Sequence, residues 1–185
     1  MTAEMTEAVR KARERKDRLL ITIDGPCASG KTTLACEMAG ILSAEVIHTD
    51  DFVIPHAMKT RERLAEPGGN CDAERLAAEV LVPWKQGLSV RYRRYDCRAD
   101  RLAETEELAD CHVLIVEGSY CNLPAIRQYA DIRVFMNTSP ELREQRLRER
   151  ETAESLVRFR RLWIPLEDAY FRAFGLPDDG MIIEG

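Results

Sequence analysis

The residues with the clearest chemical meaning are the eight at positions 25–32, which read Gly-Pro-Cys-Ala-Ser-Gly-Lys-Thr. This is the G-x-x-x-x-G-K-T pattern of a phosphate-binding loop, whose backbone N–H groups surround phosphate oxygens and whose following helix adds its positive dipole end. In this pattern Lys31 reaches the β- and γ-phosphates, and the hydroxyl of Thr32 binds Mg²⁺. The segment predicts an ATP–Mg²⁺ site. Its predicted nucleotide contacts are Gly25, Cys27, Ala28, Ser29, Gly30, Lys31, Thr32 and Thr33.

The segments on both sides of this loop have the patterns that such a loop requires. Residues 19–24 form a short, mostly apolar run typical of a buried strand. After the loop, apolar residues recur with helical spacing at Leu34, Ala35, Met38, Ile41 and Leu42. A glycine-containing turn without a ligand is the simpler alternative, but the agreement of strand, loop and helix favours a nucleotide site.

Acidic residues follow or end two further predicted strands. A short strand around residues 46–47 precedes Asp50 and Asp51, and the apolar strand over residues 113–118 has Glu117 near its end. In open α/β sheets, ligands bind at the carboxyl ends of the strands. Asp50 could there accept a proton from a substrate hydroxyl or hold Mg²⁺, and Glu117 could lie near the metal. Turn formation and capping are an equally good interpretation of the two aspartates.

Arg143, Arg146 and Arg150 are spaced so that they share one face of a helix predicted to begin at Ser139. Three guanidinium groups on one face could hold a phosphoryl group during its transfer. A surface helix with ion pairs is the alternative, yet like charges on one face repel unless an anion lies between them. We therefore expect residues 139–162 to form a mobile cover, or lid, in which these three arginines are catalytic.

The whole pattern predicts a single α/β domain over residues 1–185, built on a five-stranded parallel sheet flanked by helices. Residues 131–136 and 181–183 supply the fourth and fifth strands. Residues 3–17 favour a solvated helix with few apolar residues, which we expect to be a loosely docked N-terminal extension.

A small substrate-binding insert is expected over residues 53–100. Proline, glycine and asparagine in residues 55–73 indicate a loop. A helix is predicted to follow over residues 73–82, ended by Pro83. Residues 89–96 alternate in the manner of the strands of a small hairpin.

Composition limits the classes of partner. A net charge of −5 is the opposite of what a general nucleic-acid binder shows. The six cysteines form no C-x-x-C pair and do not combine with the three histidines at zinc-finger spacing, which favours free thiols in a reducing cytoplasm. The charged N-terminal region lacks a secretory apolar stretch, and no run approaches the ~18 apolar residues of a membrane span. We expect a cytoplasmic protein without nucleic-acid or membrane partners. Whether it forms a homodimer is left open by the sequence.

From about residue 19 to its end, the chain resembles the uridine kinase and phosphoribulokinase family of P-loop kinases. In chain order, the motifs that carry the resemblance are the phosphate-binding loop, Thr49-Asp50-Asp51-Phe52, Asn70-x-Asp72, Arg91-Tyr92-x-x-Tyr95-Asp96, Val116-Glu117-Gly118 and Arg143-x-x-Arg146-x-x-x-Arg150.

The resemblance implies a role for each matched residue. Asp50 is implied to be the catalytic carboxylate that orients and deprotonates the acceptor hydroxyl, and Asp72 to be the acid that holds ribose hydroxyls. Tyr95 is implied to lie near the acceptor, with Phe52 and Arg91 as further substrate contacts. The implied metal ligands are Thr32, Asp50 and Glu117, the last also bordering the substrate.

One departure from the family pattern concerns the acceptor. The usual Asp-His-Pro sequence beside the ribose-holding acid is absent, and Gly69, Asn70 and Cys71 precede Asp72 instead. The chain is also short for a full uridine kinase. Both departures bear on base specificity more than on phosphoryl transfer.

We therefore predict ATP- and Mg²⁺-dependent phosphoryl transfer to a hydroxyl of a small molecule, with a nucleoside such as uridine or cytidine as the leading acceptor. Nicotinamide riboside, a pantothenate-like alcohol and a sugar phosphate are alternatives with the same chemistry. A regulatory nucleotide switch is a different class, disfavoured because the guanine-reading N-K-x-D sequence is absent. A binding module without catalysis is disfavoured by the presence of Lys31, Thr32, Asp50 and Glu117.

Overall fold

A parallel sheet forms the centre of the computed structural model, which describes residues 1–177 and 180–185. The strand order across the five-stranded sheet is β2-β5-β1-β6-β7, and every neighbouring pair is parallel. The strands are β1 (Leu19–Asp24), β2 (Glu45–His48), β5 (Val113–Glu117), β6 (Ile132–Asn137) and β7 (Met181–Glu184). The predicted α/β fold with a five-stranded parallel sheet is confirmed.

β1 lies in the middle of the sheet, between two strands that come from later in the chain. All residues of β1 and of β5 are buried, as expected for parallel strands covered on both faces. The register pairs Leu20 with Leu114 and Ile23 with Glu117. The phosphate-binding loop therefore leaves β1 beside the acidic residue that ends β5.

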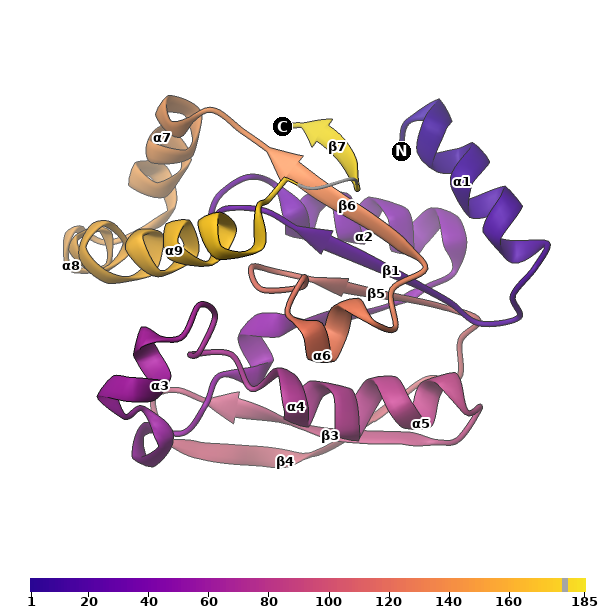
Figure 1. The fold of residues 1–185 in the computed structure, drawn as a ribbon, viewed down its shortest axis with the longest axis horizontal. Helices are drawn as coiled ribbons and strands as arrows, with labels where there is room; N and C mark the ends of the chain where they lie inside the picture. The colour runs from indigo at the N-terminus through magenta and orange to yellow at the C-terminus, as the bar shows by residue number, and fades with distance from the viewer. Residues whose placement is uncertain (178–179) are drawn as a thin grey trace.

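The carboxyl ends of the strands lie at one end of the molecule. In Figure 1 the arrowheads of β1, β5 and β6 point toward the C-terminal helical region. This region consists of α7 (Pro140–Arg150), α8 (Ala153–Arg158), the π-helical segment η4 (Phe159–Trp163) and α9 (Ile164–Phe174). Because ligands of open α/β sheets bind at the carboxyl ends of the strands, these helices border the expected site.

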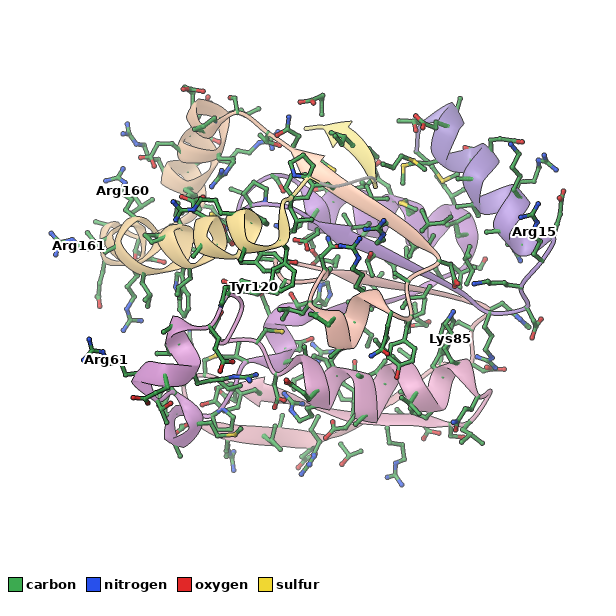
Figure 2. The ribbon with its side chains drawn as sticks, viewed as in Figure 1. Arg15, Arg61, Lys85, Tyr120, Arg160 and Arg161 are labelled. Atoms are coloured by element: carbon green, nitrogen blue, oxygen red, sulfur yellow. The ribbon has the colours of Figure 1, made fainter. Side chains whose placement is uncertain are left out.

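Arginines extend from several elements at this end of the molecule. Figure 2 shows Arg160 and Arg161 of η4 at the same end as Arg61, the first residue of α3 (Arg61–Ala65). Lys85 lies at the opposite end (Figure 2). In a chain with a net charge of −5, an anionic ligand needs such local positive charge.

Between β2 and β5 the chain forms short helices and a two-stranded hairpin. These elements are η1 (Thr49–Phe52), η2 (His56–Met58), α3, and the antiparallel pair β3 (Val90–Asp96) and β4 (Arg101–Leu108). The prediction of a loop over residues 55–73 is wrong in part. The hydroxyl of Thr60 accepts the N–H of Arg63 at 3.1 Å, and this N-cap starts the short helix α3.

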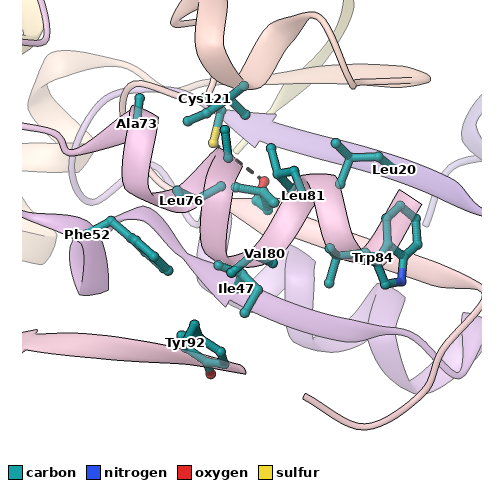
Figure 3. Packing of buried hydrophobic residues seen from close by; sticks show 14 of the residues in the cluster. Leu20, Ile47, Phe52, Ala73, Leu76, Val80, Leu81, Trp84, Tyr92 and Cys121 are labelled. Carbon is teal, nitrogen blue, oxygen red and sulfur yellow. Dashed lines mark hydrogen bonds between the residues drawn. The ribbon is translucent and has the colours of Figure 1, made fainter. Parts of the chain in front are cut away.

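Apolar residues cover both faces of the sheet. α2 (Lys31–Leu42) packs on one face. The other face carries α6 (Pro124–Arg127) and a helical run composed of α4 (Ala73–Leu76), η3 (Ala77–Leu81) and α5 (Val82–Lys85), and the hairpin packs against this run and against η1. Figure 3 shows Leu76, Val80 and Trp84 of this run packed with Leu20 and Ile47 of the sheet. In the part of the chain described, no helix is long and apolar enough to cross a membrane.

The N-terminal helix α1 (Ala3–Arg13) is docked on the sheet, so the expectation of a loosely attached extension is wrong. Met5 is 1% exposed and Val9 is 4% exposed, and both belong to the core beside α2. These two residues are four positions apart and therefore share one face of the helix. Met5 and Val9, with the partly buried Ala8 and Ala12, anchor a helix that is otherwise charged.

The helical run after residue 72 continues past Pro83, although this proline was expected to end it. Val82 donates its N–H to the carbonyl oxygen of Ala77, a π-type hydrogen bond. Pro83 then lies in the first turn of α5, a position at which proline is common in helices. The π segment thus lets the helix restart around the proline and end at Lys85.

Candidate active site

The phosphate-binding loop connects β1 to α2 and depends on two glycines with positive φ. Gly25 has φ +143°, and a Cβ atom there would lie 2.5 Å from the carbonyl oxygen of Met136 in β6. Gly30 has φ +102° and directly precedes α2. Larger residues at either position would strain the backbone. The two glycines thus allow the tight passage from strand to helix that a phosphate-binding loop needs.

Lys31, the first residue of α2, folds back over this loop. Its Nζ donates to the carbonyl oxygen of Pro26 at 2.8 Å, and the residue is buried. Ser29 is also buried, and within the described structure its hydroxyl has no hydrogen-bond partner. A cation, a helix N-terminus and an unpaired hydroxyl in one tight loop fit the phosphates of a nucleotide.

Glu117, at the end of β5, collects groups that fit a magnesium ion. Its Oε1 accepts a hydrogen bond from the hydroxyl of Thr32 at 2.9 Å. A hydroxyl and a carboxylate are ligands that Mg²⁺ prefers, and the ion usually keeps water and substrate phosphates as its other ligands. Among the described residues there is no cluster of three or more acidic, histidine or cysteine side chains that could cage a metal ion. Thr32 and Glu117 therefore fit Mg²⁺ that is bound jointly with nucleotide phosphates.

His48 is a member of this cluster that no sequence motif identifies. Its Nδ1 lies 2.6 Å from the same Oε1 atom of Glu117. This hydrogen bond is the largest cause that raises the pKa of His48; burial opposes the rise, and Asp50 and Asp51 add to it. The raised pKa keeps more of the imidazole protonated near neutral pH, so that His48 balances part of the local negative charge.

Asp50 follows β2, within η1, and lies among these charges. Its side chain is solvent-exposed, yet the protein atoms around it desolvate the carboxylate enough to raise its pKa. Lys31 opposes this rise, Glu117 adds to it, and Arg150 also favours the ionised form. Asp50 is therefore within electrostatic reach of the phosphate-binding loop, the acid that ends β5 and the lid.

Two of the three predicted lid arginines contact the loop directly. Nε of Arg143 donates to the carbonyl oxygen of Cys27 at 3.1 Å. Nη1 of Arg146 lies 3.2 Å from the carbonyl oxygens of both Ala28 and Ser29. These contacts hold both guanidinium groups beside the segment that would surround the phosphates.

Arg150 is placed differently from the other two arginines. Its Nε donates to Glu151 at 2.8 Å, and its guanidinium lies 6.0 Å from the centre of the Phe159 ring. Its influence on the ionisation of Asp50 is electrostatic. The expectation that all three arginines act on the phosphates is thus supported by direct loop contacts for only two of them.

Asp72, the predicted ribose-binding acid, is engaged by Arg75. One carboxylate oxygen accepts the N–H of Arg75 at 3.2 Å as the N-cap of α4, and the other accepts its Nε at 3.0 Å. Arg75 also donates to the carbonyl oxygen of Arg93 at 2.6 Å and lies 4.5 Å from the centre of the Phe52 ring. Asp72 therefore helps to join α4, β3 and η1.

Three further predicted substrate contacts lie elsewhere than expected. Phe52 is fully buried and stacks on Tyr92 with ring centres 6.0 Å apart, so it supports the site from the core. Arg91 is exposed, and strand alternation places it on the face of β3 opposite to Tyr92. Tyr95 is 5% exposed and donates its hydroxyl to Asp100, which raises the pKa of Tyr95 to about 12. Tyr95 thus closes the tip of the hairpin.

A β-bulge directs Arg94 toward the acidic pair after β2. The hairpin register shifts between Arg93 and Tyr95. Nε of Arg94 then lies 3.7 Å from Asp51, and its Nη2 donates to Glu106 at 2.7 Å. The two consecutive arginines interrupt the alternation of β3, and this break was the sequence signal for the bulge.

α9 supplies residues that sequence motifs did not identify. Glu167 accepts the N–H of Cys27 in the loop, and Tyr170 donates to Asp24 at the end of β1. Glu167 is three positions before the fully buried Tyr170, so both share the inner face of the helix. In the sequence, Glu167 stands on the apolar face of this helix, and a charged residue at such a position indicates a buried polar contact.

Comparison with known proteins agrees with this geometry. The family model described as "Phosphoribulokinase / Uridine kinase family" matches residues 20–155, which is more than half of the chain. The matched segment includes the phosphate-binding loop, both acidic strand ends and the arginine helix α7.

Solved structures share the fold at low sequence identity. A candidate uridine kinase from Bacillus stearothermophilus aligns with a TM-score of 0.65 and 22% identity, over 97% of this chain and 99% of its own. A candidate fructose transport system kinase from Silicibacter sp. TM1040 has a TM-score of 0.73 and 21% identity, over 100% and 99%. Phosphoribulokinase from Rhodobacter spheroides has a TM-score of 0.54 and 15% identity, over 85% of this chain and 65% of its own.

Proposed function

This chain belongs to the phosphoribulokinase and uridine kinase family and is thus a P-loop kinase for a small molecule, and we propose that its acceptor is a nucleoside such as uridine or cytidine. ATP is the proposed phosphoryl donor and Mg²⁺ the proposed metal. The observation that carries phosphoryl transfer is the position of Asp50, which follows β2 at the carboxyl end of the sheet and lies within electrostatic reach of Lys31 in the phosphate-binding loop. The nucleoside is proposed from the family to which the chain belongs.

Asp50 is the proposed general base. A base works best when its pKa approaches the working pH, and the partial desolvation of Asp50 moves its pKa in that direction. Its location at the carboxyl end of β2 lets it orient an acceptor hydroxyl toward the phosphate that Lys31 holds. In this arrangement Asp50 accepts the hydroxyl proton as the acceptor oxygen bonds to the γ-phosphorus. The bond from the γ-phosphorus to the β–γ bridging oxygen breaks in the same transfer, and ADP leaves.

The loop, the strand-end acid and the lid arginines have the remaining roles. Lys31 neutralises negative charge on the transferred phosphoryl group, and Arg143 and Arg146 are beside the loop to do the same. Thr32 and Glu117 are the residues that would hold Mg²⁺, which would supply neutralisation of the phosphate charge when bound. Closure of the lid excludes water, so that the acceptor hydroxyl competes successfully with hydrolysis.

A sugar-type alcohol is the second candidate acceptor, and one observation favours it. Both carboxylate oxygens of Asp72 already accept hydrogen bonds from Arg75. An acid engaged in this way has less capacity to hold the two hydroxyls of a ribose. The solved structures that share the fold include a candidate kinase of a fructose transport system, which agrees with this alternative.

We also propose that the protein works in a reducing compartment, the cytoplasm. All six cysteines are free in the structure, and four of them are buried. Buried free thiols are typical of proteins that fold and act where disulfides are not formed.

An acceptor screen tests the proposed function. Purified protein is incubated with ATP and Mg²⁺ and a panel of nucleosides, sugars and sugar phosphates, and ADP release and the phosphorylated product are measured. Uridine or cytidine is expected to give the highest kcat/KM. Asp50→Asn is expected to lower kcat by roughly 100-fold or more while ATP still binds, because general bases contribute about that much. Full turnover by this variant would remove Asp50 from the mechanism, and a preference for sugars would replace the nucleoside.

A further inference from the structure

A carboxylate of α9 reaches the phosphate-binding loop from its outer side. Glu167 is 6% exposed, and one of its oxygens accepts the N–H of Cys27 at 2.9 Å. On the other side of the same residue, Nε of Arg143 donates to the carbonyl oxygen of Cys27 at 3.1 Å. Charged side chains therefore bind both the backbone N–H and the backbone carbonyl oxygen of Cys27. Such charge-assisted hydrogen bonds are stronger than those between neutral groups.

The second oxygen of Glu167 connects the loop to the turn that carries Asp50. It accepts the hydroxyl of Ser119 at 2.7 Å, and that hydroxyl is also 3.1 Å from the carbonyl oxygen of Gly25. The backbone carbonyl of Ser119 in turn accepts the hydroxyl of Thr49 at 2.9 Å. Since Thr49 directly precedes Asp50, Ser119 links the proposed base to Glu167 through two hydrogen bonds.

The chain after β5 packs tightly against the turn that contains Thr49 and Asp50. A Cβ atom at Gly118 would lie 2.0 Å from the hydroxyl oxygen of Thr49. Only a glycine next to Ser119 lets the chain after β5 approach the Asp50 turn this closely. Figure 2 shows Tyr120, which follows Ser119, beside α9. The centre of its ring lies 5.0 Å from the centre of the Tyr170 ring.

A second set of buried hydrogen bonds ties α9 to the start of the loop. The hydroxyl of Tyr170 donates to Asp24 at 2.6 Å, and Asn122 donates to the same carboxylate through its backbone and side-chain nitrogens. Asp24 also accepts the N–H of Gly25 at 2.7 Å. Residues three apart on α9 thus hold the loop at two places, Gly25 and Cys27.

α9 is also the last helix of the C-terminal helical region. It follows α8 and η4 without interruption, and α7 at the other end of this region contributes Arg143 and Arg146. The loop is therefore held between the first and the last helix of the C-terminal helical region. A shift of either helix would be transmitted to the backbone of Cys27.

We infer that Glu167 is a positioning residue for phosphoryl transfer, which fixes the phosphate-binding loop relative to Asp50 through Cys27 and Ser119. The inference rests on the proposed function, because it concerns the same nucleotide site. Glu167 touches neither the acceptor nor the reacting atoms and acts through the two groups that it holds.

Three variants separate positioning from simple stability. Glu167→Ala removes both hydrogen bonds. Glu167→Gln keeps an acceptor for Cys27 and places an amide donor at Ser119, whose hydroxyl can still donate to Gly25. Leu176→Ala is the matched control, since Leu176 packs on the core just after α9 and donates only its backbone N–H to Phe171.

The measurements are the dissociation constant for ATP with Mg²⁺ by calorimetry and the melting temperature of each variant. Glu167→Ala is expected to weaken ATP binding by on the order of tenfold, the scale of one hydrogen bond to a charged group. Glu167→Gln is expected to restore most of the affinity, and Leu176→Ala is expected to lower the melting temperature with unchanged affinity. If Glu167→Ala does not fold, Ser119→Ala replaces it in the same comparison.

The outcomes distinguish this inference from the proposed function. Absence of ATP binding by the wild-type protein, or unchanged binding by Lys31→Ala, would refute the nucleotide site itself. Normal wild-type binding together with equal affinity of Glu167→Ala would refute the positioning role alone. The positioning role would also be refuted if Glu167→Gln lost as much affinity for ATP as Glu167→Ala. The loss of affinity would then not depend on the hydrogen bonds that Glu167 accepts.

Discussion

Cys27 lies inside the phosphate-binding loop, yet its surroundings make the thiol unreactive. Burial is the largest cause that raises its pKa to about 11, and the negative charge of Glu167 adds to the rise while Arg143 opposes it. The thiolate is the reactive form of cysteine, so a thiol with this pKa is almost fully protonated at neutral pH. A small side chain that fits between Glu167 and Arg143 explains the residue better than a redox role.

Alkylation measures the reactivity of the Cys27 thiol directly. At pH 8, Cys27 is expected to react with iodoacetamide far more slowly than the exposed Cys36, because the Cys27 thiol is buried and its pKa is raised to about 11. Mass spectrometry of the labelled peptides gives both rates in one sample. Comparable rates at the two positions would show that the loop opens often enough to expose Cys27.

At the residue scale, the motifs predicted which residues lie near the phosphate-binding loop, and the roles assigned to these residues stay predictions. The structure brings Lys31, Thr32 and Glu117 together as the loop and strand-end patterns indicate. It failed to anticipate the burial of Phe52 and the outward face of Arg91, because burial depends on which elements pack together later in the chain. A motif specifies the residue types but not which way each side chain points.

At the element scale, α7 joins the lid to the phosphate-binding loop through two arginines. Arg143→Ala and Arg146→Ala are each expected to lower kcat/KM for ATP by on the order of 100-fold, because each removes a donor that would face developing phosphate charge. Arg148→Ala is the control: this arginine is on the same helix but is exposed and pairs with Glu144 at 2.8 Å. Steady-state kinetics of the three variants are compared.

An equal effect of all three substitutions would contradict the assignment, because it would show that α7 acts through its overall charge. An unchanged kcat/KM in Arg143→Ala would show that its contact with Cys27 is only structural. The exposed ion pair of Arg148 and Glu144 is expected to contribute little by itself.

The N-terminal helix α1 is the second element whose role can be tested. Met5→Ala is expected to lower the free energy of unfolding by about 2–5 kcal/mol, the usual cost of truncating a buried methionine. Lys11→Ala, on the exposed side of the same helix, should change it by less than about 0.5 kcal/mol. Urea denaturation followed by circular dichroism measures both. A loosely attached helix would instead tolerate both substitutions equally.

Sequence patterns identified the five strands of the parallel sheet and the helices at residues 3–17, after the phosphate-binding loop, at 73–82 and after Ser139, but not how firmly each was held. They did not identify β4, α3, α6, α8 or α9. The apolar runs of β1, β5 and β6 are long enough to indicate buried strands without tertiary information. In α1, by contrast, only the spacing of Met5 and Val9 distinguishes a docked helix from a solvated one. The π segment before Pro83 could not be predicted either, since it arises where packing holds a helix together across a proline.

At the scale of the whole molecule, Asp131 connects three parts of the chain at the end opposite the site. Its carboxylate accepts the N–H of Leu20 and the ammonium group of Lys85, both at 2.7 Å, and also pairs with Lys16. Burial acts to raise the pKa of Asp131, but the hydrogen bonds from Lys16, Lys85 and Leu20 outweigh it and lower the pKa. The ionised carboxylate thus joins the segment before β1, α5 and β6.

The lowered pKa gives a defined dependence of stability on pH. A carboxylate whose pKa is lower in the folded state stabilises that state above its unfolded pKa of about 3.9, and the contribution is lost as pH falls through the folded pKa. Asp131→Asn is therefore expected to destabilise the protein by about 1–3 kcal/mol at pH 7, and by progressively less as the pH falls below about 3.9. Urea denaturation at several pH values measures the difference. A difference that is constant with pH would mean that the ionised form of Asp131 is not what matters.

The sheet order could not be read from the sequence, because five parallel strands can be arranged in several ways. The structure places β1 between β5 and β6, and this order brings Glu117 next to the phosphate-binding loop. What the sequence did supply was the class of fold, since apolar strands alternating with helices are typical of a parallel sheet. The strand order follows from packing among elements that are far apart in the chain.

The phosphate-binding loop also reaches its final conformation late in synthesis and refolding. Residues 24–27 emerge early, but the groups that hold them are Asn122, Glu167 and Tyr170, which are 98, 140 and 146 positions from their partners. Contacts between such distant positions form slowly, because a long stretch of chain must first be brought together. In refolding followed by stopped flow, a fluorescent ATP analogue is expected to bind only in the slowest phase. A newly made chain would therefore gain affinity for ATP only once α9 had left the ribosome.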